Sequence, residues 1–254
     1  MPMIQLPQAD LFYAAHLPPD AQQTVVLVHG AGGSRLVWPA ALRRLPHTAV
    51  YALDLAGHGR SHPPGRQTIT AYAQDVLDFI EALSLQNVFL LGHSMGGAIV
   101  QQVGLAALPS VAGLILLGTS ARLRVSSKIL GAIEADVETA VDLLNRFFWS
   151  GTPAAEMLTK NRQMMLACAP EVLLNDFLAC DQFDLRGRLS EILLPTLVLS
   201  GENDQMTPPK FGQFLAEQIP NAEYVLIKEA GHMMMLEEAE NVALAVQNFV
   251  NSLQ

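Results

Sequence analysis

The stretch that decides the fold is Asn87-Val88-Phe89-Leu90-Leu91-Gly92-His93-Ser94-Met95-Gly96-Gly97. Its apolar first half predicts a buried strand, and the small apolar residues from 95 to 107 predict a buried helix. A serine exposed at the sharp turn between them needs a strained backbone, so the positions two before and two after it must be nearly free of side chain. Gly92 and Gly96 meet that requirement. Ser94 is therefore a candidate nucleophile; the alternative is a glycine-rich packing turn with an idle serine.

Other short apolar runs predict further strands at residues 24–28, 49–53, 114–117, 196–199 and 224–227. Each ends at glycine or a polar residue, as parallel strands buried on both faces do. Helical patterns alternate with them at residues 70–83, 95–107, 208–219 and 237–253, and Thr70 is the expected N-cap of the first. This alternation predicts an α/β fold with a doubly wound, mostly parallel sheet. Residues 4–6 and 11–15 are expected to add an antiparallel edge hairpin.

From about residue 122 to residue 190 the strand signal disappears, and helical patterns occur at 129–149, 153–167 and 170–180. We interpret this stretch as an inserted all-helical cap. The expected domains are an α/β core of residues 1–120 and 190–254 and a cap of residues 121–189. Most of the large apolar cap residues should pack inside the cap or against the core, but a cap over the sheet edge implies an apolar pocket beneath it.

Two backbone amides are candidates for an oxyanion hole. A helix that begins beside Ser94 points its first amides at the site, so the amide of Met95 can donate to an oxyanion. The loop of residues 29–34 follows the first parallel strand and can bring the amide of Ala31 to the same place. This loop is neither G-x-G-x-x-G nor a loop that ends in Gly-Lys, so nucleotide binding is not expected.

Seven histidines compete for the role of general base. His232 follows the last strand and precedes the last helix, which places it at the same sheet edge as Ser94, where sites form in open α/β sheets. His29 and His93 are expected to support loop geometry. The acid should follow a strand, and Asp204 does so, whereas residues 118–120 at the other usual position contain no acid. Glu202 is expected to be a solvated loop charge.

The order Ser94, Asp204, His232 with these loops resembles the α/β-hydrolase superfamily, specifically its single-domain capped members. The resemblance covers about residues 24–120 and 190–252, and the cap is too variable to be recognised. It implies that residues 54–61 form a structural loop after the second strand. Serine at position 94 departs from the dehalogenase and epoxide-hydrolase branches, which use aspartate there. The implied activity is a carboxylesterase-like serine hydrolase that acts on small, fairly apolar esters with no metal or organic cofactor.

Several alternatives stay open on the same scaffold. They are lactonases, carbon–carbon bond hydrolases that act on diketones, and cofactor-free perhydrolases resembling haloperoxidases. A different class is a protein that retains the triad but acts as a ligand receptor or signalling partner. Arg122 and Arg124 follow the strand at 114–117, where the core gives way to the cap, and would either hold a substrate carboxylate or be solvated cap residues. The natural substrate and the oligomeric state are not predicted.

The composition is that of a folded chain long enough for a single α/β sheet protein. Half of the 254 residues are hydrophobic, which provides material for a large core, and the net charge of −9 argues against a nucleic-acid partner. The uncharged stretch 87–121 contains too many polar and small residues for a membrane span, so no membrane partner is expected. Cys168 and Cys180 fit no metal or redox spacing and should be small core residues. Because they are not expected to form a disulfide, a cytoplasmic location is expected. No signal peptide is visible in residues 1–7.

Overall fold

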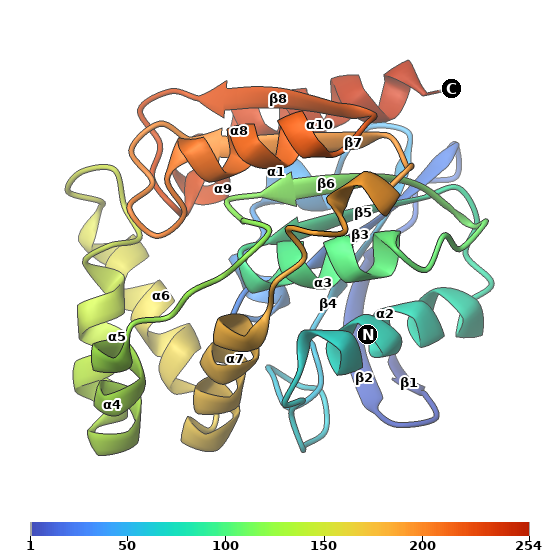
Figure 1. Ribbon diagram of the computed structural model, residues 1–254. Coiled ribbons are helices and arrows are strands. Elements are labelled where there is room, and N and C mark those ends of the chain that lie inside the picture. Colours follow the sequence, from blue (N-terminus) through green and yellow to red (C-terminus); the bar gives the residue numbers. More distant parts are fainter. Residues whose placement is uncertain (1, 254) are drawn as a thin grey trace.

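The computed structural model describes residues 2–253. These residues form one eight-stranded sheet in the order β1-β2-β4-β3-β5-β6-β7-β8 (Figure 1). Only β1–β2 and β2–β4 pair antiparallel; all later neighbours are parallel. The strands are β1 (Met3–Gln5), β2 (Asp10–His16), β3 (Gln23–Val28), β4 (Thr48–Leu53), β5 (Val88–His93), β6 (Val111–Leu117), β7 (Thr196–Gly201) and β8 (Ala222–Ile227). The predicted mostly parallel sheet and its antiparallel edge hairpin are confirmed.

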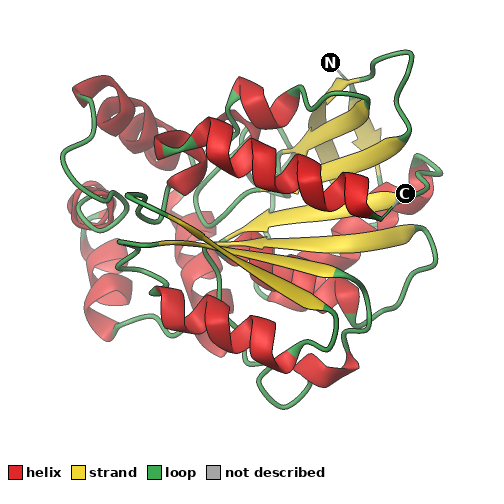
Figure 2. Ribbon diagram, turned by 90° about the horizontal axis from the view of Figure 1, so that it is seen from above, coloured by secondary structure: helices red, strands yellow, loops and turns green. Residues whose placement is uncertain are grey.

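Helices cover both faces of the sheet, which explains the continuous apolar runs. Every residue of β5 and β7 is buried. One core cluster joins the sheet to α2 (Ile69–Ala82), α3 (Met95–Gly104) and α8 (Pro209–Gln218), and the other joins it to α1 (Ala40–Arg43) and α10 (Ala239–Ser252). Figure 2 shows the twisted strands between these two helical layers. Helices on both faces are the expected consequence of right-handed crossovers between parallel strands.

The carboxyl ends of the central strands lie side by side, and this positions the loops that matter for function. Val28 pairs with Gly92, His93 with Leu117, and Gly201 with Ile227. The residues that follow these strands therefore meet at one edge of the sheet, as open α/β sheets require of a site.

Two predicted helix boundaries are wrong. The N-cap of α2 is Thr68 and not Thr70, because Thr68 has the extended backbone of a cap and its side chain accepts the amide of Ala71. The predicted long helix at 129–149 is two helices, α4 (Ser127–Ala135) and α5 (Val137–Asn145). They are separated by Asp136, whose φ of −160° ends α4 and whose carboxylate caps the amide of Glu138 at the start of α5.

The insertion between β6 and β7 is helical, as predicted, and continues with α6 (Ala155–Leu166) and α7 (Pro170–Gln182). In Figure 1 these helices lie towards the side to which the arrowheads of β6 and β8 point. The division into a core of residues 1–120 and 190–254 and a cap of residues 121–189 stays a proposal. Within residues 2–253, no helix combines the length and apolar character needed to cross a membrane.

Candidate active site

Ser94 occupies a strained turn between β5 and α3. Its backbone has φ 54° and ψ −115°, a conformation that an L-residue adopts only when its surroundings enforce it. A Cβ at Gly92 would overlap the carbonyl oxygen of Gly96, and a Cβ at Gly96 would overlap that of Val28. The Ser94 amide donates to the carbonyl of Leu117 at 3.0 Å, which ties the turn to β6. The sharp turn predicted around Ser94 is present, with the serine side chain at the surface of a pocket.

Two backbone amides near this serine are the candidates for an oxyanion hole: Met95 follows Ser94 in the chain, and Ala31 lines the same pocket as Ser94. Met95 is the first residue of α3, so its amide has no partner within the helix. The loop that contains Ala31 packs against the turn, since a Cβ on Gly30 would lie 3.2 Å from the Cβ of Ser94. Among residues 2–253, no backbone acceptor receives the Ala31 amide. Two backbone donors thus remain available beside the serine.

His232 and Asp204 form a buried hydrogen-bonded pair. His232 Nδ1 lies 2.9 Å from Asp204 Oδ2, and the two residues are 2% and 3% exposed. Thr207 supports the carboxylate with its amide to Oδ1 and its hydroxyl to Oδ2, each at 2.8 Å. Burial alone would raise the pKa of Asp204, but His232 and the Thr207 donors hold it below its ordinary value. An ionised Asp204 accepts Nδ1–H and leaves Nε2 of His232 free to accept a proton.

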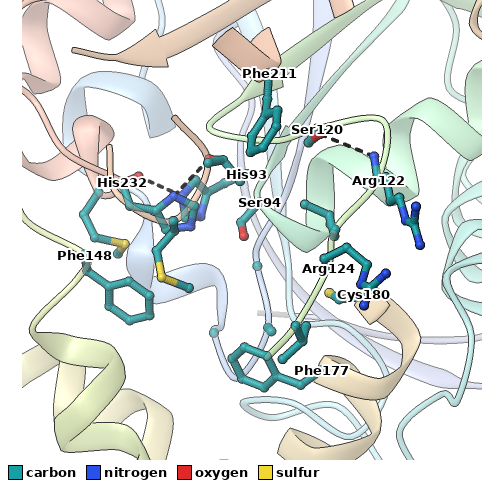
Figure 3. Close-up of a pocket in the computed structure, with 18 of the residues that line it drawn as sticks. His93, Ser94, Ser120, Arg122, Arg124, Phe148, Phe177, Cys180, Phe211 and His232 are labelled. Carbon is teal, nitrogen blue, oxygen red and sulfur yellow. Dashed lines mark hydrogen bonds between the residues drawn. The ribbon is translucent and has the colours of Figure 1, made fainter. Parts of the chain in front are cut away.

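Two aromatic rings fix the position of His232 (Figure 3). Phe148 stacks on its ring with centroids 5.6 Å apart, and the His93 ring lies 4.7 Å away. His93 Nε2 donates to the carbonyl of His232 at 3.0 Å. Burial, and then the neighbouring His232, lower the pKa of His93 to about 3, so its ring is neutral. His93 supports loop geometry, as the sequence predicted.

A pocket of about 650 Å³ opens in front of Ser94 and His232. Its walls come from the segment after β6, from α6, α7 and α8, and from the loops beside Ser94. Of the large apolar cap residues, Phe148, Met164, Met165 and Phe177 line it, whereas Trp149 and Leu173 are buried in the core. Figure 3 shows Phe148 beside His232 and, across the pocket from it, Arg122, Arg124 and Cys180. The predicted apolar pocket under the helical insertion is present.

Asp176 on α7 is a central residue that sequence reasoning missed. Its fully buried carboxylate accepts three hydrogen bonds: from the Gly32 amide at 2.9 Å, from the Tyr72 hydroxyl at 2.7 Å and from His58 Nε2 at 2.8 Å. Burial opposes a charged imidazole, but Asp176 overcomes it and raises the pKa of His58 well above its ordinary value. Asp176 thereby ties the loop that contains Ala31 to the helical insertion. These partners are 104 to 144 residues away in the chain, so no local sequence pattern predicts these contacts.

His29 shows why the same loop keeps its shape. Its Nε2 accepts the Leu55 amide at 3.0 Å, so Nδ1 carries the proton and donates to the Gly30 carbonyl at 2.8 Å. Burial, and then the nearby His58, lower the pKa of His29 to about 3. The neutral ring of His29 is therefore held in one tautomer, and its two hydrogen bonds hold the loop in place. This agrees with the structural role predicted for His29.

The structure also places the two cysteines, Glu202 and the two arginines that the sequence singled out. Cys168 and Cys180 are buried and free, as predicted. Glu202 is exposed, as expected of a loop charge. Arg122 and Arg124 line the pocket, and each lies near a carboxylate: Asp184 at 3.6 Å and Asp181 at 3.5 Å. Within residues 2–253, His, Cys, Asp and Glu side chains form no cluster of three that suits a metal ion.

Comparison with known proteins gives a consistent result. A family model described as "Alpha/beta hydrolase family" matches residues 25–246. A pimeloyl-[acyl-carrier protein] methyl ester esterase of Neisseria meningitidis serogroup B is 29% identical over 91% of this chain and 94% of its own. A solved thermophilic esterase is 30% identical, with a TM-score of 0.87 over 99% of this chain and 97% of its own. An esterase from Thermogutta terrifontis, solved with malate bound, is 26% identical, with a TM-score of 0.89 over 100% and 99%.

Proposed function

Because the chain belongs to the alpha/beta hydrolase family, we propose that it is a serine carboxylesterase that cleaves small, fairly apolar esters. Ser94 is the nucleophile, His232 the general base and Asp204 the acid that orients it. The observation that carries this proposal is the buried hydrogen bond between His232 and Asp204 beside a serine on a strained turn. The esterase relatives support the ester bond as the target.

The first half-reaction forms an acyl-enzyme. Ser94 Oγ attacks the carbonyl carbon of the ester while its proton passes to Nε2 of His232. Asp204 keeps the other ring proton on Nδ1 and stabilises the imidazolium. The carbonyl electron pair moves onto oxygen, where the amides of Ala31 and Met95 donate to it, each such donor being worth roughly 3 kcal/mol. Collapse of this intermediate expels the alcohol, which takes the proton from His232.

Water completes the cycle. It attacks the carbonyl carbon of the acyl group bound to Ser94 Oγ and gives a proton to His232. The same two amides hold the second oxyanion. When that intermediate collapses, the acid leaves and the proton returns to Ser94 Oγ. The enzyme is then in its starting state, and the net reaction is ester plus water to acid plus alcohol.

The pocket supports a mainly apolar substrate. Leu123, Val125, Phe148, Met165 and Phe177 line its interior. Removing apolar surface from water contributes about 25 cal/mol for each Å² buried, so an acyl or alcohol chain gains affinity with length until the pocket is filled. A volume of about 650 Å³ suits a small molecule and not a long polymer.

A substrate screen with a nucleophile variant tests the proposal. Purified protein is assayed on 4-nitrophenyl esters of increasing acyl length, on lactones and on a diketone, with Ser94→Ala as the control. We expect rapid multiple turnover of the esters and a loss of about 10⁴-fold or more in Ser94→Ala. Preferential turnover of lactones or of the diketone would reassign the reaction. A single slow turnover with a ligand-dependent change in unfolding temperature would indicate a receptor instead.

A further inference from the structure

The charges that line the pocket are unlike those of the rest of the chain. The sequence contains 24 acidic and 15 basic residues. Four of the basic residues line the pocket, and no aspartate or glutamate of the described chain does. They are Arg122, Arg124, Arg186 and Lys210. A cavity lined by one sign of charge focuses the potential and attracts ligands of the opposite sign, even when the net charge of the protein is −9.

Nearby carboxylates compensate only part of this charge. Arg186 is held by Asp184 at 2.7 Å, and Arg122 lies 3.6 Å from the same carboxylate. Arg124 lies 3.5 Å from Asp181, whose Oδ1 also accepts the Val125 amide. Two carboxylates therefore face three arginines, and neither carboxylate lines the pocket.

Lys210 is the least compensated of the four cations. It is exposed in the first turn of α8 and forms no ion pair with residues 2–253. Its ammonium lies 5.3 Å from the ring centroid of Phe211, which also lines the pocket. Phe211 supports the lysine without neutralising it. Within the described chain, Lys210 thus offers three free donors and an unpaired positive charge at the wall of the cavity.

We infer that the pocket takes esters with an apolar chain that ends in an anionic group, a carboxylate or a phosphate, and that Lys210 binds this group. The inference rests on the proposed esterase function and specifies its substrate class. An anionic end at an exposed lysine keeps part of its hydration, so the desolvation cost stays small while the chain fills the apolar interior. For such a charge pair we expect about a twofold to tenfold gain in kcat/KM.

Matched substrates test this inference. Mono-4-nitrophenyl esters of dicarboxylic acids with six to eight carbons are compared with the corresponding ω-amides, which have nearly the same shape but no charge. A third series ends in phosphate and distinguishes the two anions. The wild type should prefer the charged esters, and 0.5 M NaCl should reduce the preference because salt screens exposed charges. In Lys210→Gln the ratio of acid to amide should fall towards one, whereas Lys210→Arg should retain it.

A second exposed lysine provides the control, and the outcomes are separable. Lys228 follows β8, is exposed and does not line the pocket. The Lys228→Gln variant should therefore keep the wild-type ratio of acid to amide hydrolysis. Equal rates on acid and amide would overturn the inference and leave the esterase function standing. A preference that survives in Lys210→Gln would overturn the role of Lys210. Failure to hydrolyse any of the esters would contradict the esterase function itself.

Discussion

Ser94 adopts a backbone conformation that costs on the order of 1–3 kcal/mol, and three features of its surroundings maintain it. Gly92 and Gly96 allow the strand and helix to approach, and the hydrogen bond to Leu117 fixes the turn on the sheet. Asp204 is constrained as tightly, by the Thr207 amide and hydroxyl. This geometry fits the proposed roles of Ser94 as the residue that reacts and of Asp204 as the carboxylate that stays ionised.

Asp204→Asn tests the acid directly. An asparagine amide would donate to Nδ1 of His232 and favour the tautomer with its proton on Nε2, which cannot accept the Ser94 proton. We expect kcat on a 4-nitrophenyl ester to fall by about 10⁴-fold with little change in fold. Glu202→Gln, in the same loop but exposed, should retain wild-type kcat. Activity of Asp204→Asn within tenfold of wild type would mean that another carboxylate orients the histidine.

At the scale of elements, α7 is joined to the loop of residues 29–34 through Asp176. The carboxylate receives donors from the loop, from α2 and from the turn that contains His58. A helix of the insertion therefore sets the position of a loop that belongs to the sheet. This contact explains how the loop that contains Ala31 stays packed against the turn at Ser94 although it follows a different strand.

Asp176→Asn should loosen this connection. Asparagine has one acceptor oxygen for three donors, and it leaves His58 without a buried counter-charge, so we expect a loss of about 3–5 kcal/mol in the free energy of unfolding. We also expect kcat to fall by about tenfold or more with a smaller change in KM, because the Ala31 amide loses its support. Urea unfolding and steady-state kinetics measure the two effects. Glu171→Gln, exposed on the same helix, should change neither.

The elements also show how far sequence reasoning reaches. The strands and the turn at Ser94 were predictable because parallel strands buried on both faces are apolar throughout and because the serine needs glycine on either side. The break at Asp136 was not predicted, since the apolar pattern runs through it and only the carboxylate capping reveals it. Thr68 and Thr70 are both good caps in sequence, and only the backbone conformation distinguishes them.

At the scale of the whole molecule, the topology of the sheet decides where the candidate site residues lie more than any single motif does. The common sheet edge of Ser94, Asp204 and His232 was predictable because parallel strands end on one side. The contact of Asp176 with His58 and the place of Lys210 in the pocket wall were not predictable. Both depend on how the helical insertion and α8 pack against the sheet. Sequence singled out Arg122 and Arg124, to which the structure gives carboxylate neighbours.

The buried pair of His58 and Asp176 should make the stability of the whole chain depend on pH. The pKa of His58 is raised in the folded state, so the pair contributes its full stabilisation below about pH 6.5, the ordinary value for histidine. This contribution is lost as pH rises through the raised folded pKa. The difference in unfolding free energy between wild type and His58→Gln should therefore be larger at pH 6 than at pH 9. An equal difference at both values would mean that folding does not raise the pKa of His58.

The most direct test of the central claim is covalent labelling of the nucleophile. The protein is treated with a fluorophosphonate, which reacts with activated serines, and its mass and residual esterase activity are followed together. We predict one adduct per chain on the peptide that contains Ser94, inactivation in step with labelling, and no adduct in Ser94→Ala. Full activity in protein that remains unlabelled, or equal labelling of Ser94→Ala, would contradict the assignment of Ser94 as the nucleophile.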